Sequence, residues 1–197
     1  MTSVSIFVRS DVEPDDRSLL TEAIGTVAGC GAHAVEVEYR CIRCGESGHG
    51  KPFVTSPLGL FVSLTRSGAT VAVAVTDAAP IGIDIEAIAA VGRASVAEAL
   101  LHPSEHDALD GLSEASTAEH LTRLWTVKEA VLKATGWGLH IDPELLAVDL
   151  DDGATLIEWP ESLTLDDAPH LTLLDLPNGL VGALALLGPH AGRPSYF

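Results

Sequence analysis

In the segment Ile81–Glu86 every second residue is isoleucine, and the residues between are glycine, aspartate and glutamate. Successive side chains of a strand point to opposite faces, so this pattern predicts a strand with one apolar face and one face that carries Asp84 and Glu86. Residues two apart lie roughly 6 to 7 Å apart, so the two carboxylates can converge on one hard cation. Oxygen ligands without a nearby His or Cys favour Mg²⁺ or Mn²⁺. The alternative is a solvated acidic face at a sheet edge.

Further along the chain, the residues around Trp125 predict a helix whose apolar stripe contains a lysine. At about 100° per residue, one stripe holds Leu121, Leu124, Trp125, Lys128 and Leu132. A buried ammonium needs an anion, unless Lys128 extends along its stem to solvent. Glu129 and Lys133 lie one turn apart on a neighbouring face, in the favourable order for an ion pair. Such pairs are also common on helix surfaces, so the helix alone does not define a site.

Together, these segments resemble the paired motifs of the 4'-phosphopantetheinyl transferases. The acidic strand precedes Trp125–Lys133, which has the form Trp-Thr-x-Lys-Glu-Ala-x-x-Lys. Upstream, Gly48–Pro52 resembles the glycine-lysine-proline box of that family, and Phe61–Gly68 stands in place of its Asn-x-Ser-His-Ser segment. The length and the order of the motifs resemble the two-lobed, surfactin-synthetase-activating type.

The resemblance implies an α+β fold of two similar α/β lobes, related by a pseudo-twofold axis, with the active site between them. The expected N-terminal lobe, residues 1–90, would bind the adenine and 3'-phosphate and supply the acidic strand. The expected C-terminal lobe, residues 91–197, would supply the Lys-Glu helix. The residue patterns themselves predict strands at 3–8, 34–41, 60–65, 70–76, 80–86, 145–149, 155–159, 170–175 and 180–187, and helices at 15–28, 91–101, 104–109 and 117–136.

The resemblance also implies an activity of the holo-[acyl-carrier-protein] synthase type. Members of this family move the 4'-phosphopantetheine arm of coenzyme A onto a serine of an apo acyl or peptidyl carrier protein and release 3',5'-ADP. Such carriers serve fatty-acid, polyketide or nonribosomal-peptide synthesis. The expected metal ligands, for Mg²⁺ or alternatively Mn²⁺, are Asp84, Glu86 and Glu129. Lys128 and Lys133 would face phosphate oxygens, and Glu129 would accept the serine proton, directly or through a metal-bound water.

Coenzyme A itself would be held by two further groups of residues. On the adenine side these are Gly50, Lys51 and Pro52, and at the 3'-phosphate they are Thr65, Arg66 and Ser67. Arg66 stands where the family often has histidine, and Ser63 where it often has asparagine. Arginine is always charged and can bind a phosphate through two hydrogen bonds, so the role is expected to persist. The alternative for Arg66 is a solvent-exposed residue of a hairpin turn.

The stretch Gly45–Lys51 also matches the start of a phosphate-binding loop, G-x-x-x-x-G-K. Pro52 then stands where that motif needs a Ser or Thr hydroxyl for magnesium, which breaks the match. Because the first part of the motif does match, a Mg²⁺-dependent nucleotide hydrolase is one alternative function. A non-catalytic coenzyme A binding protein is another, although the retained carboxylates and Lys133 argue against it.

The chain has three cysteines, an odd number that argues against a disulfide framework. Cys41-x-x-Cys44 followed by His49 is compatible with zinc. A structural zinc site needs four ligands, and of the remaining residues His33 alone lies close enough in sequence, at an unsuitable spacing. A turn with partly buried thiols is the favoured interpretation.

Charge limits the partners. The chain has 11 Lys and Arg against 28 Asp and Glu, a net charge of −17, which disfavours nucleic acid and long-range attraction to an acidic carrier protein. Carrier docking is then expected to be local and apolar, around residues 100–112. The sequence shows neither a segment of membrane-spanning length nor the basic start of a secretory signal, so a cytoplasmic protein without membrane contact is expected. The two expected lobes suggest a monomer.

Overall fold

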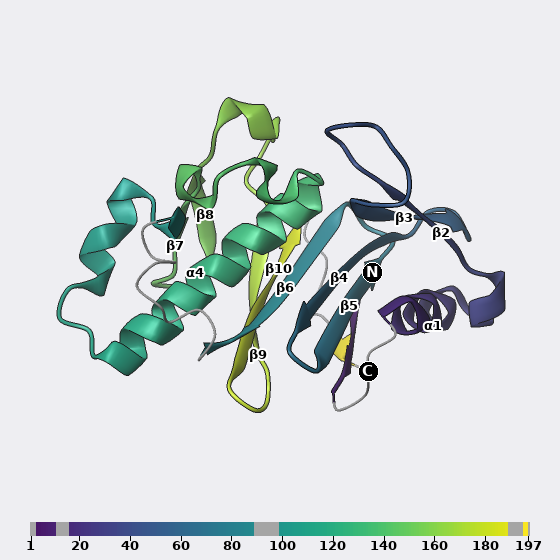
Figure 1. Ribbon diagram of the computed structural model, residues 1–197, viewed down its shortest axis with the longest axis horizontal. Helices are drawn as coiled ribbons and strands as arrows, with labels where there is room; N and C mark the ends of the chain where they lie inside the picture. The colour runs from purple at the N-terminus through teal and green to yellow at the C-terminus, as the bar shows by residue number, and fades with distance from the viewer. Residues whose placement is uncertain (1–2, 11–15, 89–98, 189–194, 197) are drawn as a thin grey trace.

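The computed structural model describes residues 3–10, 16–88, 99–188 and 195–196 (Figure 1). The first half supplies β1 (Val4–Arg9), α1 (Asp16–Ala28), β4 (Phe61–Ser67) and β5 (Thr70–Thr76), and the C-terminal end supplies β11 (Ser195–Tyr196). These strands form one sheet in the order β11-β1-β5-β4. The alternating Thr, Val and Ala residues of β5 are all buried, because the strand is antiparallel to a neighbour on each side and covered on both faces. Helix α1 covers one of those faces.

The second half forms a three-stranded antiparallel sheet in the order β6-β10-β9. Its elements are β6 (Ile81–Ala87), α4 (Glu114–Thr135), β9 (His170–Asp175) and β10 (Leu180–Leu186). Helix α4 lies across one face of this sheet and contacts β6 and β10 (Figure 1). It ends at Gly136, whose φ of 87° is the left-handed conformation that glycine adopts readily. Each half thus runs from a strand to a helix and then to two antiparallel strands, of which the later one is central.

Two hairpins and five short 3₁₀ segments complete the described chain. The hairpins pair β2 (Glu36–Arg40) with β3 (Lys51–Ser56) and β7 (Ala147–Asp149) with β8 (Thr155–Glu158), and the 3₁₀ segments are η1 (Ala32–Ala34), η2 (Pro103–Leu109), η3 (Gly138–His140), η4 (Pro143–Leu145) and η5 (Glu161–Leu163). The first hairpin reaches the end of helix α4. There Lys51 Nζ donates to the Ala134 carbonyl at 2.5 Å and to the Ile81 carbonyl at 3.3 Å. The glycine-rich loop before Lys51 is therefore fixed to the second half of the molecule.

The isoleucines of β6 lie in a core that both sheets share. Ile81, Ile83 and Ile85 pack there with residues of β1, β5, β9 and β10. A second core lies between α1 and the first sheet, and a third, larger core lies under α4. Because alternate side chains of a strand point to opposite faces, this arrangement turns Gly82, Asp84 and Glu86 towards helix α4. The predicted alternation of β6 is confirmed.

Strands β4 and β6 meet where the two sheets adjoin, and three hydroxyl side chains connect them. We call these residues of β4, Ser63, Thr65 and Ser67, the hydroxyl ladder. Ser63 Oγ accepts from the Ile83 backbone N–H at 3.1 Å, and Ser67 Oγ accepts from that of Ala87 at 3.1 Å. The ladder residues alternate along β4, so they share the face that β6 approaches.

Glycine at position 82 lets α4 lie directly on β6. A Cβ added there would lie 1.9 Å from the Ala130 carbonyl oxygen and 2.6 Å from the Ala134 nitrogen. Because these atoms belong to the helix backbone, the clash can be removed only if α4 moves away from β6. We expect Gly82→Ala to lower the free energy of unfolding by about 3 kcal/mol, measured by urea denaturation.

Gly29→Ala is a matched control for this substitution. Gly29 has a φ of 69° and nothing within 4 Å of an added Cβ. The control substitution therefore lowers stability through backbone strain alone, without a steric clash. That strain is about 1 kcal/mol. An equal decrease in the free energy of unfolding of the two variants would contradict a close contact between β6 and α4.

The mixed α+β class predicted from the sequence is confirmed. The strands at 70–76 and 170–175 have the predicted bounds. For most of the other predicted strands, the observed bounds lie within two residues of the predicted ones. Strand β3 was not predicted, and residues 104–109 form a 3₁₀ segment and not an α-helix. Most of the predicted helix at 91–101 lies outside the described residues. Among the described residues, no helix combines the length and hydropathy that crossing a membrane requires.

The expected docking region around residues 100–112 needs a correction. Leu100 and Leu101 lie in the core under α4, with exposed fractions of 0% and 5%. Leu112, in contrast, is exposed. Buried side chains cannot contact a partner, so Leu100 and Leu101 do not contribute to the expected apolar surface, and docking at the rest of this region stays a prediction.

Candidate functional site

Asp84 lies at the centre of a polar cluster between β6, β4 and α4. Its carboxylate is 3% exposed. Oδ1 accepts from Thr65 Oγ1 at 2.8 Å and from Lys133 Nζ at 2.5 Å. Oδ2 is buried and has no hydrogen-bond partner in the described part of the chain. A buried oxygen without a donor is costly, so Asp84 offers one acceptor position to a bound group.

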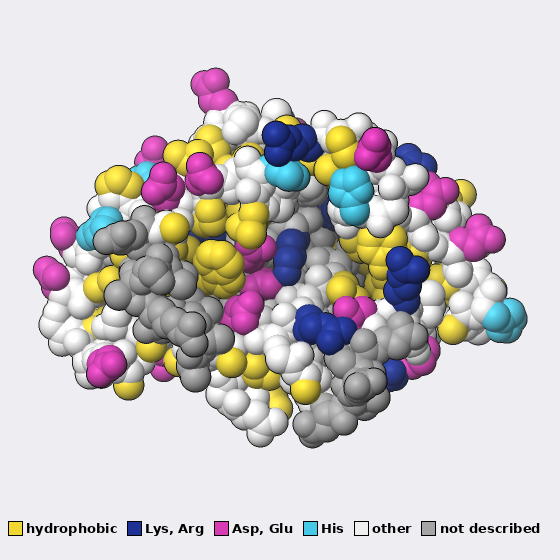
Figure 2. Space-filling view, in the orientation of Figure 1, with side chains coloured by type: hydrophobic (Ala, Val, Ile, Leu, Met, Phe, Trp, Pro, Cys, Tyr) yellow, Lys and Arg dark blue, Asp and Glu magenta, His cyan; other side chains and the backbone are white. Residues whose placement is uncertain are grey.

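Glu129 faces the same cluster from helix α4. It is 7% exposed, and its Oε1 is the second buried oxygen without a partner among the described residues. Burial raises the pKa of Glu129 to about 7; the charges of Asp84 and Glu86 raise it as well, and Lys133 opposes them. Acidic and basic side chains meet in a hollow near the middle of this face of the molecule (Figure 2). A divalent cation would relieve both the lost solvation and the mutual repulsion.

Glu86 is the third carboxylate, half-buried near the end of β6. Its Oε2 accepts from Ser67 Oγ at 2.8 Å. Burial, foremost, and the charge of Asp84 raise its pKa. The carboxylates of Asp84, Glu86 and Glu129 are thus close enough to influence one another electrostatically. They are not gathered around one point, because the only described group of donor atoms that all lie within 4.8 Å of one another is Cys41, Cys44 and His49.

Lys133 is the cation of this cluster. Its Nζ donates to Asp84 Oδ1 and, at 3.2 Å, to Thr65 Oγ1. The side chain is 27% exposed, so solvent and a ligand can reach it. The structure therefore places Asp84, Glu86, Glu129 and Lys133 in one cluster, and their expected roles at a metal and a phosphate stay predictions.

Lys128 is placed elsewhere, and its predicted contact with phosphate needs a correction. The side chain is 0% exposed, and Nζ donates to Glu105 Oε2 at 2.6 Å and to the Leu100 carbonyl at 2.7 Å. Glu105 in turn accepts from the backbone N–H groups of His102 and Val148, both at 2.8 Å. The apolar stripe correctly predicted burial of Lys128, and the required anion is Glu105, inside the protein.

Glu105 was not identified from the sequence. It is the third residue of the first 3₁₀ turn after His102; its Oε2 accepts from the His102 N–H, and His102 Nδ1 accepts from the Ser104 N–H. This is the arrangement of a capping box, for which Glu at that position is a signal. The signal was weak because His102 stands where the motif normally has Ser or Thr.

Thr65 and Ser67 also differ from their predicted role at the 3'-phosphate. Both hydroxyls are buried and donate to the carboxylates of Asp84 and Glu86. These bonds orient the two acids from the neighbouring sheet. Thr65 and Ser67 are therefore positioning residues in this structure.

Arg66 points away from the hydroxyl ladder, as its place in the strand alternation requires. Its guanidinium is 37% exposed and forms an ion pair with Asp16 at the start of α1. A phosphate that bound Arg66 would have to share the guanidinium with Asp16 or displace that carboxylate. The predicted phosphate contact stays a prediction.

Gly50, Lys51 and Pro52 line a cavity of about 280 Å³ between the first hairpin and the end of α4. Lys133 and Ser63 line it as well, so the cavity extends to the acidic cluster. Burial lowers the pKa of Lys51 to about 8. Lys51 also lines a second, mostly apolar cavity of about 410 Å³, together with Phe53 and Phe61.

The pKa of Glu129 predicts how stability changes with pH when divalent cations are absent. Because the folded-state pKa of about 7 exceeds the ordinary value of 4.5, the folded protein binds this proton more tightly than the unfolded chain does. Stability should therefore fall as the pH rises from about 4.5 through 7, by up to about 3 kcal/mol. Asp84 and Glu86, whose pKa values are also raised, act in the same direction.

Urea denaturation of the chelated protein between about pH 5 and pH 8 measures this slope. Glu129→Gln removes the titrating group and should flatten the profile over this range. Equal slopes for the two proteins would show that Glu129 does not carry the effect.

Comparison with known proteins finds similarity to one family. The family model of the 4'-phosphopantetheinyl transferase superfamily matches residues 80–174, which contain both the acidic strand and the Lys-Glu helix. A 4'-phosphopantetheinyl transferase of Bacillus subtilis is 31% identical over 121 residues, 61% of this chain and 53% of that protein. The HetI protein of Nostoc sp., also a 4'-phosphopantetheinyl transferase, is 28% identical over 178 residues, 87% of this chain and 69% of that protein.

A solved structure, an acyl carrier protein synthase of Plasmodium yoelii with ADP bound, aligns with a TM-score of 0.48 at 18% identity, over 57% of this chain and 97% of that one. The chain spans about half the length of the first curated relatives it matches, with shares of 53%, 44% and 48%. The matched region, however, carries Asp84, Glu86, Glu129 and Lys133. Over these residues the chain is similar to the 4'-phosphopantetheinyl transferase superfamily, and the curated relatives are themselves 4'-phosphopantetheinyl transferases.

Proposed function

We propose that this protein transfers the 4'-phosphopantetheine arm of coenzyme A to a serine of an apo carrier protein, with Mg²⁺ or Mn²⁺, and releases 3',5'-ADP. One observation carries the proposal. Asp84 and Glu129 each have a buried oxygen without a described partner, and both lie near Lys133, which lines a cavity. A pyrophosphate with a divalent cation has the charges that such a cluster can neutralise.

The cation would be held by Asp84 and Glu129 through those oxygens, with Glu86 beside them. When bound, it would neutralise the pyrophosphate and stabilise the charge on the departing nucleotide. Lys133, now hydrogen-bonded to Asp84 and Thr65, is the residue that would contact the transferred phosphate. Its position on a rigid helix and its partly exposed amine support that role.

Glu129 is the proposed acceptor of the serine proton. A pKa of about 7 suits a group that takes up and releases a proton near neutral pH. A glutamate that binds a metal is a weaker base, so its two roles compete. If the turnover of Glu129→Gln recovers when the Mg²⁺ concentration is raised, Glu129 acts as a metal ligand. If turnover does not recover, Glu129 acts as the base.

The nucleotide is proposed to occupy the cavity beside Gly50, Lys51 and Pro52. Gly50 has a φ of 91°, and an added Cβ would lie 2.4 Å from the Arg40 carbonyl oxygen, so only glycine fits this wall. Lys51 adds positive charge beside Lys133 in the same wall. Both features support binding of an anionic ligand whose flat base lies against the backbone.

Two lobes with a pseudo-twofold relation are proposed for the whole fold. The two sheets support this because their strands follow the same order, with β1, β5 and β4 corresponding to β6, β10 and β9. Strand β6 pairs with β10, which favours a lobe boundary before Ile81 over the expected one at residue 90. The monomeric state and the cytoplasmic location stay predictions from the sequence.

The alternative nucleotide hydrolase receives less support. Lys51 begins strand β3, whereas a phosphate-binding loop of the Gly-Lys type leads into a helix whose N-terminus faces the phosphates. The loop here closes a hairpin between β2 and β3. Hydrolysis of ATP without any carrier protein would be the observation that revives this alternative.

Mass spectrometry of an apo carrier protein, incubated with this protein, coenzyme A and Mg²⁺, tests the proposed function. The carrier should gain one phosphopantetheine arm, and 3',5'-ADP should appear in equal amount. Acyl, polyketide and peptidyl carriers should be tried in parallel. A lack of transfer to all three, while coenzyme A binds, would instead indicate a non-catalytic binding protein.

Arg66→Ala tests the 3'-phosphate assignment. Because the guanidinium would pair with that phosphate, we expect the apparent KM for coenzyme A to rise about tenfold, and that for 3'-dephospho-coenzyme A much less. Arg40→Ala is a matched control, since Arg40 is also exposed and paired with a carboxylate, that of Glu38. Equal changes with the two substrates would refute the assignment.

A further inference from the structure

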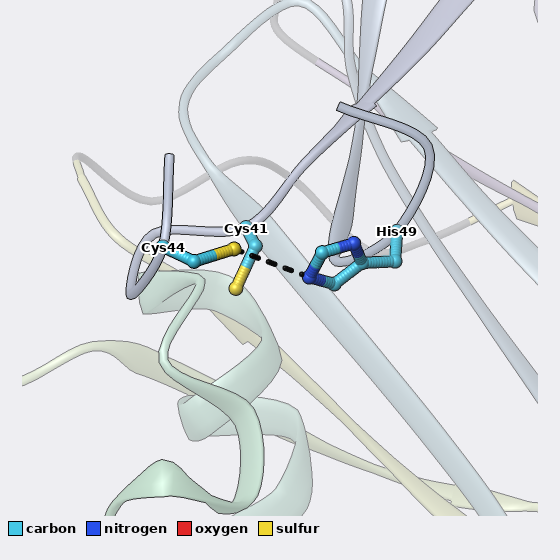
Figure 3. A group of neighbouring side chains, drawn as sticks. All are labelled: Cys41, Cys44 and His49. Carbon is cyan, nitrogen blue, oxygen red and sulfur yellow. Dashed lines mark hydrogen bonds between the residues drawn. The ribbon is translucent and has the colours of Figure 1, made fainter. Parts of the chain in front are cut away.

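The loop between β2 and β3 brings together three side chains that the proposed reaction does not use. Cys41, Cys44 and His49 each offer one ligand atom, and these atoms all lie within 4.8 Å of one another. Figure 3 shows the two thiols and the imidazole turned towards a common point. Cys44 Sγ lies 3.4 Å from His49 Nε2. Three soft or borderline donors from one short segment thus meet at one place.

This spacing matches tetrahedral zinc. With Zn–S at about 2.3 Å and Zn–N at about 2.0–2.1 Å, tetrahedral angles place a sulfur and a nitrogen ligand about 3.6 Å apart. The observed distance between Cys44 Sγ and His49 Nε2 is within a few tenths of an ångström of that value. Thiolate and imidazole ligands favour zinc over Mg²⁺, which prefers oxygen.

The local backbone also supports a metal ligand at Cys41. The turn that follows Cys41 brings the backbone N–H groups of Arg43 and Cys44 towards its thiol. Amide donors stabilise negative charge on sulfur, which is the form that binds a metal. The turn that supplies them is closed by a 2.9 Å bond from the Gly45 N–H to the Cys41 carbonyl, and Gly45 has a φ of 71°. The turn is therefore built around the Cys41 sulfur.

We propose that Cys41, Cys44 and His49 form a zinc site with three protein ligands and a fourth position open to water. Cys44 and His49 lie on the exposed side of the loop, so an ion and a water molecule can reach them. The Glu46 carboxylate, 4.0 Å from Cys44 Sγ, adds negative charge next to the ion. The sequence interpretation disfavoured zinc because it required four ligands, and an open fourth position removes that requirement.

The site would fix the wall of the cavity beside the acidic cluster. His49 precedes Gly50 directly, and Cys41 and His49 line the same cavity as Lys51 and Lys133. An ion that joins the two sides of the loop would limit the conformations of the Gly50–Pro52 segment. Zinc binding is measured without coenzyme A or a carrier, so its outcome is independent of the proposed transferase reaction.

The test uses the full chain purified under reducing conditions without a chelator. Elemental mass spectrometry should find about one zinc ion per chain. After chelation and reloading with Co²⁺, the thiolate ligands should produce a sulfur-to-cobalt charge-transfer absorption band. Carboxylates produce no such band, so the signal excludes Co²⁺ bound at Asp84 and Glu129.

Three variants make the test specific. Cys44→Ser and His49→Ala should each lose the bound zinc and weaken or abolish the cobalt band. Cys30→Ser is the matched control, because Cys30 is an exposed free cysteine outside the cluster, and it should behave as the wild type. Circular dichroism and cooperative urea unfolding confirm that each variant is folded. The proposal is overturned if the reduced wild type shows no cobalt band, or if folded Cys44→Ser and His49→Ala both bind zinc as tightly as it does.

Discussion

Asp84→Asn is expected to reduce carrier modification by about 10²–10³-fold while the protein remains folded. The substitution keeps the shape of the side chain but removes the charge that pairs with Lys133 and that a cation needs. An amide would also place an N–H group at one of the two positions now held by carboxylate oxygens. The rate of 3',5'-ADP release, followed at several Mg²⁺ concentrations, measures the effect.

Asp77→Asn is a matched control, because Asp77 is an exposed aspartate in the turn that precedes β6. It should retain full activity. The proposed site would be wrong if folded Asp84→Asn kept more than about a tenth of the wild-type rate at saturating Mg²⁺.

Lys128→Met should destabilise the fold by about 3–5 kcal/mol. The substitution leaves the carboxylate of Glu105 buried, with an exposed fraction of 5%, and without its cation. Burial of an uncompensated charge is expensive, even though Glu105 keeps its bonds from the His102 and Val148 amides. Urea denaturation should show a lower midpoint with an unchanged slope.

Two comparisons test this interpretation of Lys128. The double variant with Glu105→Gln should recover much of the lost stability, because it removes the buried charge. Lys133→Met, which replaces a partly exposed lysine on the same helix, should cost less stability and more activity. Unchanged stability in Lys128→Met, together with a raised KM for coenzyme A, would restore the phosphate role first expected for this lysine.

The acidic cluster could be predicted because its residues lie in strongly periodic elements. Alternation in β6 fixed the face of Asp84 and Glu86, and the helical period of α4 placed Glu129 and Lys133 on a common side. The same helical period predicted that Lys128 is buried. Local patterns of this kind persist in the fold because each element has one apolar face that must be covered.

Partners distant in the sequence could not be predicted. Nothing in the periodicity of α4 identifies Glu105 as the anion for Lys128, because their contact depends on how the core under the helix is packed. Thr65 and Ser67 have the right chemistry to bind phosphate or to orient a carboxylate, and the side-by-side placement of β4 and β6 decides between these roles. Strand β3 was missed because its second residue is proline, a residue that disfavours a strand assignment.

The hydroxyl ladder makes the acidic cluster a joint property of two parts of the molecule. The acids are supplied by β6 and α4, but the hydroxyls that orient Asp84 and Glu86 come from β4. If the two halves arose by duplication of a shorter ancestor, neither copy could have diverged freely afterwards. A change on one side of the contact between β4 and β6 would have selected for a compensating change on the other side. Selection would therefore favour both halves remaining in a single gene.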